Sequence, residues 1–204
     1  PVSTADNLVE ASQDCGSFVQ LSGVLKRVAV KLSKTCNDLR LLSSGPRAGL
    51  GEINLPTTQA GSSIIPGKVN PVIPEVVNQI AFEVIGNDLT VSFAAEAGQL
   101  QHNAFEPIIA HSLFKSITHL RNGCLVLADR CVRGITANRE KMAHNLHNSL
   151  MLVTALNPYI GYDNAAKTAK KAFKENISLK EACVALGFLT AEKFDEVFHP
   201  EQMV

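Results

Sequence analysis

The feature that most constrains the fold is a run without proline over residues 5–42. Its apolar side chains recur at helical spacing and comprise Leu8, Cys15, Phe18, Val19, Val24, Leu25, Val28, Leu32, Cys36 and Leu39. This periodicity predicts one long helix from Ala5 to Leu42, which at 1.5 Å per residue would be about 57 Å long. A compact globule of 204 residues has a diameter of about 43 Å. The mismatch favours an elongated bundle whose apolar faces are completed by other subunits or by further chain.

Residues 43–74 have a composition that no helix tolerates, because glycine and proline recur throughout the segment. The same residues exclude a central strand. A loop of this length is uncommon inside a compact domain and usually carries binding or catalytic residues. We therefore expect the functional site in this segment.

Helical periodicity resumes after the loop. Two further long helices are expected at 74–97 and 105–133, and four short ones at 139–152, 163–175, 178–186 and 191–198. Ser178 and Glu181 have the spacing of a capping box, and Thr190 can cap the last helix. The change from long to short helices places a domain boundary near Glu140. The pattern predicts an all-α fold, with a long helical bundle in 1–140 and a small C-terminal helical domain in 141–204.

Charge and cysteine usage exclude several classes of protein. Lys plus Arg and Asp plus Glu both number 19, so the net charge of +0 argues against a nucleic-acid or anionic-membrane partner. No apolar run approaches the roughly 20 residues that a membrane span needs. The five cysteines are scattered without a C-x-x-C pair, which favours reduced thiols and a cytoplasmic location. No secretory signal follows Pro1, and the missing initial Met suggests processing or a fragment.

The most informative motif is the loop 61–71, Gly-Ser-Ser-Ile-Ile-Pro-Gly-Lys-Val-Asn-Pro. It is no phosphate-binding P-loop, because five residues separate Gly61 from Gly67 and Val69 follows Lys68. If the chain is extended there, Lys68 and Asn70 point to the same side and could receive one carboxylate. The residues alone leave an ordinary solvated turn as the alternative.

A metal site is not expected. Glu140, His144 and His147 have the helical spacing of a two-histidine, one-carboxylate site. The same spacing is common on a solvated helix face, and the sequence contains no H-E-x-x-H motif.

The loop resembles the signature of the fumarase and aspartase superfamily, G-S-S-x-x-P-x-K-x-N-P, with Ile65 in place of the usual Met. The resemblance covers essentially the whole chain. The segments LLSSGPRAGLGEINLP and AAEAGQLQ resemble aspartate ammonia-lyases more than fumarases, whereas the tail from Ser149 is shared closely with fumarases. Members of the superfamily are more than twice this length, so the chain resembles their C-terminal portion, with 1–140 as part of the central bundle domain.

The resemblance implies a carbon–nitrogen lyase that converts L-aspartate reversibly to fumarate and ammonia by anti-elimination. It implies Ser62 as the base, Glu75 as the partner of a histidine in a segment outside this chain, and Ser63, Lys68 and Asn70 as substrate-binding residues. It implies no redox cofactor and no obligatory metal, and it is compatible with activation by Mg2+. A homotetramer assembled through the central helices is also implied.

Two alternatives stay open. The first is a class II fumarase (fumarate hydratase), which needs the same carboxylate receptor and base. The second is a non-catalytic helical oligomerisation module, and these 204 residues in isolation are expected to be inactive.

Overall fold

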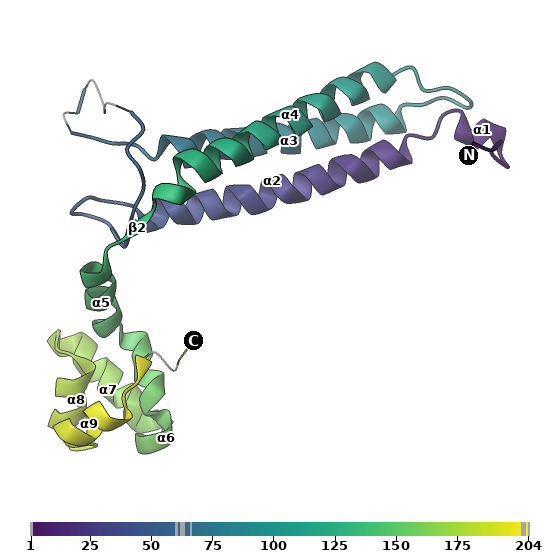
Figure 1. Ribbon diagram of the computed structural model, residues 1–204. Coiled ribbons are helices and arrows are strands. Elements are labelled where there is room, and N and C mark those ends of the chain that lie inside the picture. Colours follow the sequence, from purple (N-terminus) through teal and green to yellow (C-terminus); the bar gives the residue numbers. More distant parts are fainter. Residues whose placement is uncertain (1, 60, 62–63, 66, 201–202, 204) are drawn as a thin grey trace. The chain divides into compact units, whose positions relative to one another are not determined.

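The computed structural model describes residues 2–59, 61, 64–65, 67–200 and 203 (Figure 1). It divides into two compact units, Pro1–Asn138 and Arg139–Val204. The first unit contains the helices α1 (Leu8–Ala11), α2 (Gly16–Leu42), α3 (Val72–Glu96) and α4 (Glu106–Arg130). The predicted all-α class is confirmed.

The helices α2, α3 and α4 form a bundle in which consecutive helices run antiparallel (Figure 1). Its interior is divided into three small apolar clusters along the bundle, centred on Val91, Val84 and Val77 of α3. The helix α3 contributes to all three clusters and therefore lies at the centre of the packing.

Polar side chains interrupt the apolar interior of the bundle. Asp88 of α3 is buried and accepts hydrogen bonds from Ser22 at 2.8 Å and Lys26 at 2.6 Å. Asn78 of α3 is also buried and donates to the backbone oxygen of Ser33 at 3.1 Å and to its hydroxyl at 2.9 Å. Buried polar groups need such partners, so these bonds favour one axial alignment of α2 against α3.

The prediction of one helix from Ala5 to Leu42 was wrong, because the chain leaves the helix between α1 and α2. The side chain of Asn7 caps α1 by accepting from the backbone N–H of Val9 at 3.1 Å. The Asp14 carboxylate then accepts from the N–H of Gly16 at 3.0 Å, at the start of α2. These local bonds replace helical ones. With 27 residues, α2 is about 40 Å long, so its length alone does not exceed a globule.

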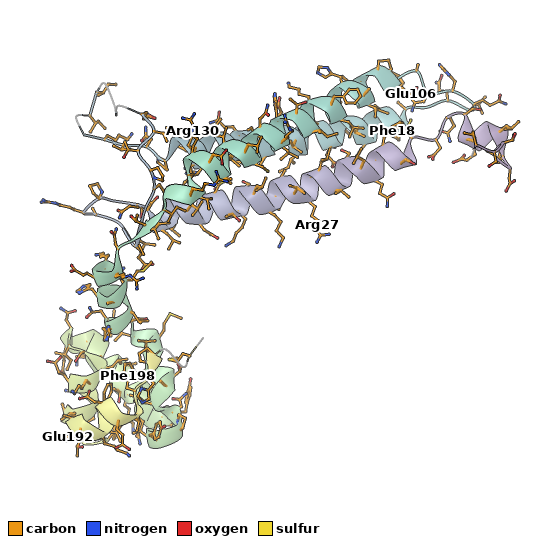
Figure 2. All side chains as sticks on the ribbon, viewed as in Figure 1. Phe18, Arg27, Glu106, Arg130, Glu192 and Phe198 are labelled. Atoms are coloured by element: carbon orange, nitrogen blue, oxygen red, sulfur yellow. The ribbon has the colours of Figure 1, made fainter. Side chains whose placement is uncertain are left out.

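Large apolar side chains are nevertheless exposed along the bundle. Four of them share one face of α3 and are 37–63% exposed: Phe82, Ile85, Leu89 and Phe93. On α2, Phe18 projects from the helix and is 44% exposed (Figure 2). A contiguous apolar face of this kind is typical of a surface that another protein segment covers.

The second unit consists of α5 (Arg139–His147), the 3-10 helix η2 (Leu150–Leu156), α6 (Asn157–Ile160), α7 (Tyr162–Glu175), α8 (Leu179–Ala185) and α9 (Ala191–Val197). Its core is one cluster of eight buried residues that includes Leu156, Cys183 and Phe194. The capping box is confirmed, since Ser178 and Glu181 bond each other's backbone N–H, and Thr190 caps α9.

The prediction of a helix over 139–152 was wrong beyond His147. The Asn148 side chain donates to the backbone oxygen of His144 at 2.7 Å, which ends α5. The chain then continues through η2 and α6, which the apolar pattern did not separate from the preceding helix.

No helix in the described part of the chain combines the length and the apolar character that crossing a membrane requires.

Candidate functional site

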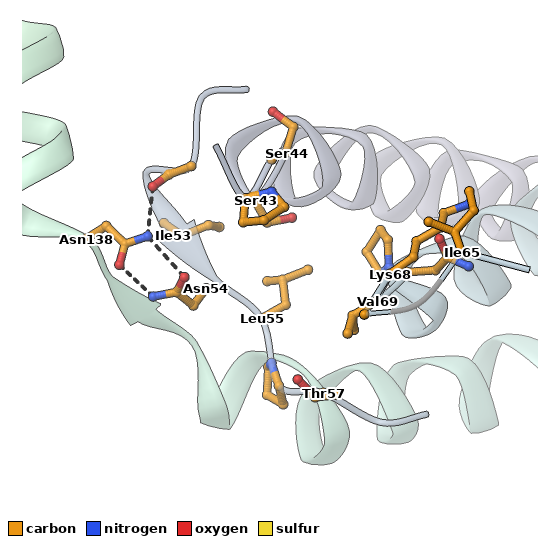
Figure 3. Close-up of a pocket in the computed structure, with 17 residues that line it drawn as sticks. Ser43, Ser44, Ile53, Asn54, Leu55, Thr57, Ile65, Lys68, Val69 and Asn138 are labelled. Carbon is orange, nitrogen blue, oxygen red and sulfur yellow. Dashed lines mark hydrogen bonds between the residues drawn. The ribbon is translucent and has the colours of Figure 1, made fainter. Parts of the chain in front are cut away.

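The first unit contains a hollow of about 720 Å³ beside the ends of α2 and α3 (Figure 3). One part of its lining is the segment from Ser43 to Thr57, which continues α2. The other part is the segment from Ile65 to Pro71, which leads into α3. The hollow therefore lies within the glycine- and proline-rich region where the sequence predicted the site.

The segment after α2 folds back on the end of that helix through its serines. The Ser43 hydroxyl donates to the backbone oxygen of Leu39 at 2.7 Å, and the Ser44 hydroxyl donates to that of Leu41 at 2.6 Å. Ser44 also accepts from the backbone N–H of Leu50 at 3.1 Å. The two hydroxyls thus satisfy terminal carbonyls of α2 and fix the start of the segment that lines the hollow.

The segment after α2 continues as a short strand that the sequence analysis did not predict. The strand β1 (Ile53–Asn54) pairs antiparallel with β2 (Thr136–Ala137), which follows the 3-10 helix η1 (Val132–Gly134). A Cβ atom on Gly134 would lie 2.5 Å from Cγ of Pro56, so only glycine permits this close approach. The pairing joins residues 82 positions or more apart in the sequence.

Close contacts join the described residues of the loop 61–71. Gly61 has a φ of +99°, and a Cβ atom there would lie 2.9 Å from the backbone oxygen of Lys68. The N–H of Lys68 donates to the backbone oxygen of Ile65 at 3.2 Å, and the N–H of Val72 donates to that of Asn70 at 2.9 Å. Both Lys68 and Asn70 line the hollow.

Electrostatics favour an anion in this hollow. Among the described residues that line it, Lys68 carries the only charge. The N-terminus of the 25-residue helix α3 begins beside the lining residue Pro71 and adds partial positive charge. An ammonium, a carboxamide and a helix N-terminus together suit a carboxylate.

The other predicted site residues have different outcomes. Ser62 and Ser63 lie outside the described residues. Glu75 is half-buried in the first turn of α3 and is not among the lining residues of the hollow. Its backbone N–H donates to the oxygen of Pro71 at 3.1 Å, within the same turn.

Sequence reasoning missed Asn54 and Asn138, which both line the hollow. Asn54 lies in LLSSGPRAGLGEINLP, whose resemblance to aspartate ammonia-lyases is a signal that could have marked it. Asn138 follows a two-residue strand, and no local pattern marks it.

No group of three His, Cys, Asp or Glu side chains in the described ranges is arranged to hold a metal ion. Glu140, His144 and His147 all belong to those ranges, on α5.

Comparison with known proteins supplies the family. The family model described as Lyase matches residues 1–86, and the model described as Fumarase C C-terminus matches residues 152–204. The aspartate ammonia-lyase of Helicobacter pylori is 60% identical over 205 residues, which cover 100% of this chain and 44% of the relative. That of Escherichia coli is 52% identical and is covered to 43%.

The chain belongs to the fumarase/aspartase superfamily. Two solved structures of similar proteins agree with this. A fumarate lyase:delta crystallin from Brucella melitensis is 53% identical with a TM-score of 0.91, over 99% of this chain and 44% of that one. A class II fumarase from Schistosoma mansoni is 42% identical with a TM-score of 0.94, over 98% of this chain and 42% of that one. The chain spans less than half the length of the superfamily relatives that it matches.

Proposed function

We propose that this chain forms the carboxylate-receiving part of an aspartate ammonia-lyase, a carbon–nitrogen lyase that converts L-aspartate reversibly to fumarate and ammonia. The observation that carries the proposal is that Lys68 and Asn70 line one hollow at the start of α3. Relatives named aspartate ammonia-lyase at 52–60% identity over the whole chain support this leaving group.

The chemistry explains why a cation is needed. Removal of the proton next to a carboxylate accumulates negative charge on that group, so donors placed in advance lower the barrier. Lys68 can donate charge-assisted hydrogen bonds and Asn70 neutral ones, from positions two residues apart in the sequence. A hollow that excludes part of the water strengthens both interactions.

Ser62 is the proposed base for the anti-elimination, and Ser63 is proposed to bind substrate beside it. A serine oxyanion needs support, for which the loop amides and the Lys68 ammonium are available. Glu75 is proposed to orient a histidine from a segment outside this chain. The first-turn position of Glu75 on α3 also suits a carboxylate.

The rest of the site is proposed to come from other segments and other copies. The exposed apolar face of α3 supports assembly through the central helices into a homotetramer. The five free thiols support a reducing compartment, the cytoplasm. No redox cofactor is required by the proposed chemistry, and activation by Mg2+ is compatible with it.

A hybrid enzyme tests the proposal. In it, this chain replaces the matching part of the Helicobacter pylori relative, and the product is assayed with L-aspartate for ammonia and for the ultraviolet absorbance of fumarate. We expect activity close to that of the unaltered relative, and loss of turnover with little change in substrate affinity in Ser62→Ala, since a base acts mainly in the transition state. A correctly assembled hybrid without activity would overturn the proposal.

The fumarase alternative is separated in the same assay. The class II fumarase from Schistosoma mansoni, at 42% identity and a TM-score of 0.94, is the observation that favours it. We expect the hybrid to consume fumarate with ammonium and not with water alone. The isolated 204-residue chain, as a further control, is expected to form no fumarate from L-aspartate.

A further inference from the structure

Asn54 and Asn138 form a closed pair of carboxamides at the edge of the hollow (Figure 3). Nδ2 of Asn54 donates to Oδ1 of Asn138 at 2.6 Å, and Nδ2 of Asn138 donates back to Oδ1 of Asn54 at 3.0 Å. Each amide therefore both donates to the other and accepts from it. Side chains that bond each other in this way link protein segments and have less capacity left to bind a ligand.

The pair also fixes the backbone of residues 51–57, which form one wall of the hollow. Nδ2 of Asn138 donates to the oxygen of Gly51 at 2.7 Å, and its backbone N–H donates to that of Glu52 at 2.8 Å. Nδ2 of Asn54 donates in addition to the Thr136 hydroxyl at 3.2 Å. Asn138 thus bonds the wall at three points, namely Gly51, Glu52 and Asn54.

The backbone pairing at this place is too short to hold the wall alone. The strands β1 and β2 have two residues each, and an isolated two-stranded ribbon is marginal in water. Asn54 is exposed and Asn138 is half-buried, so water competes for single bonds here. A closed ring of amide bonds resists this competition better than the same bonds made separately.

We infer that Asn54 and Asn138 are positioning residues that hold the wall 51–57 in place across the hollow from Lys68. They are not catalytic residues, because their amides are bonded to each other. The close contact between Gly134 and Pro56 fixes the same wall independently of the pair. This inference rests on the proposed function and deepens it, since the wall then sets the space that a small dicarboxylate occupies.

The kinetic test uses the hybrid enzyme with Asn54→Ala, Asn138→Ala and the double variant. We expect kcat/KM for L-aspartate to fall about tenfold to a hundredfold in each single variant, because displacing a positioning element by about 1 Å can cost that much. Most of this fall should come from a higher KM. The kcat/KM of the double variant should be within about twofold of that of the less active single variant, since the effects of partners that act as one unit are not additive.

The matched control is Asn87→Ala. Asn87 donates to the Ser116 hydroxyl at 3.0 Å between α3 and α4, and neither residue lines the hollow. We expect kcat/KM within about twofold of the parent, as for a polar side chain that leaves the site intact. Direct substrate binding by Asn138 would instead make Asn54→Ala nearly harmless, and that result would overturn the inference.

Deuterium exchange on the 204-residue chain tests the clamp without any catalysis. We expect peptides covering 51–57 to exchange faster in Asn138→Ala and Asn54→Ala, and unchanged in Asn87→Ala. Unchanged exchange in the first two variants would overturn the clamp. If the parental hybrid proved inactive, the proposed function would fail, and the exchange result would decide whether the pair holds the wall.

Discussion

The two units of this chain bury their apolar residues in different ways. The second unit has one core of eight buried residues, with further apolar side chains packed around it. The first unit divides its core into three small clusters and leaves Phe82, Leu89 and Phe93 more than half exposed on α3. The second unit therefore gathers its buried residues in a single core, although Tyr162 and Phe173 are exposed there, whereas the first distributes them along a bundle that carries an exposed apolar face and a hollow.

The largest expected effect comes from opening the core of the second unit. Phe194 is 3% exposed and stacks on Phe198 with ring centroids 4.8 Å apart. Phe194→Ala should lower the free energy of unfolding of this unit by about 3–5 kcal/mol. Deuterium exchange in α7 and α8 measures this loss of stability.

The matched control is Phe173→Ala in the same unit, where the side chain is 79% exposed. Its effect should be within about 0.5 kcal/mol. Equal effects of the two substitutions would mean that the second unit has no closed core and would contradict the contrast between the two units.

A smaller effect is expected at the exposed apolar face of the first unit. Phe82→Ser with Phe93→Ser removes apolar surface that we expect another copy to cover. Complete burial of an aromatic side chain contributes about 1.5–3 kcal/mol, and only part of each ring is left to be covered, so removing both should weaken self-association at least tenfold. Sedimentation of the parent and the variant measures this change, with Phe173→Ser as the control. A parent that sediments only as a 21.9 kDa monomer at micromolar concentration would contradict the proposed assembly.

The smallest effect concerns an ion pair on the bundle. Lys115 and His119 of α4 bond the Glu83 carboxylate at 2.6 and 2.5 Å and lower its pKa, Lys115 having the larger influence. A lowered pKa stabilises the folded state above the ordinary value of 4.5, and this contribution is lost as the pH falls through the folded value.

Glu83→Gln should therefore cost less than about 1 kcal/mol at neutral pH, because the group is partly exposed, and the difference from the parent should close in acid. Urea unfolding at neutral and at acidic pH measures the difference. Glu96→Gln, in the exposed last turn of α3, is the control for the loss of a surface carboxylate and should change the free energy of unfolding by no more than about 0.5 kcal/mol. A Glu83→Gln cost that grew in acid would contradict the assigned cause.

The sequence predicted the elements whose signals are local and repeated. The long helices α3 and α4 follow from apolar periodicity, and the caps at Ser178 and Thr190 follow from side chains that bond their own helix. The same approach failed at Asp14, where one side-chain bond to Gly16 outweighs the helical pattern around it.

The site was predictable only in part. Lys68 and Asn70 lie in a motif, so their spacing could be interpreted without a structure. Asn54 and Asn138 meet only because the chain returns after two long helices, and no local rule encodes that meeting.

We propose that the hollow of the first unit receives a substrate carboxylate. The most direct test is kcat/KM for L-aspartate in the hybrid enzyme carrying Lys68→Ala. Loss of one preorganised donor should lower it about a hundredfold to a thousandfold, with KM and kcat both affected. Asn70→Ala should lower it less, because its hydrogen bond is neutral. Lys68→Arg should not restore it, since a planar guanidinium cannot replace a compact ammonium. Lys170→Ala on α7 is the control and should match the parent. Near-parental values for both Lys68 variants would contradict the claim and assign the carboxylate to other segments.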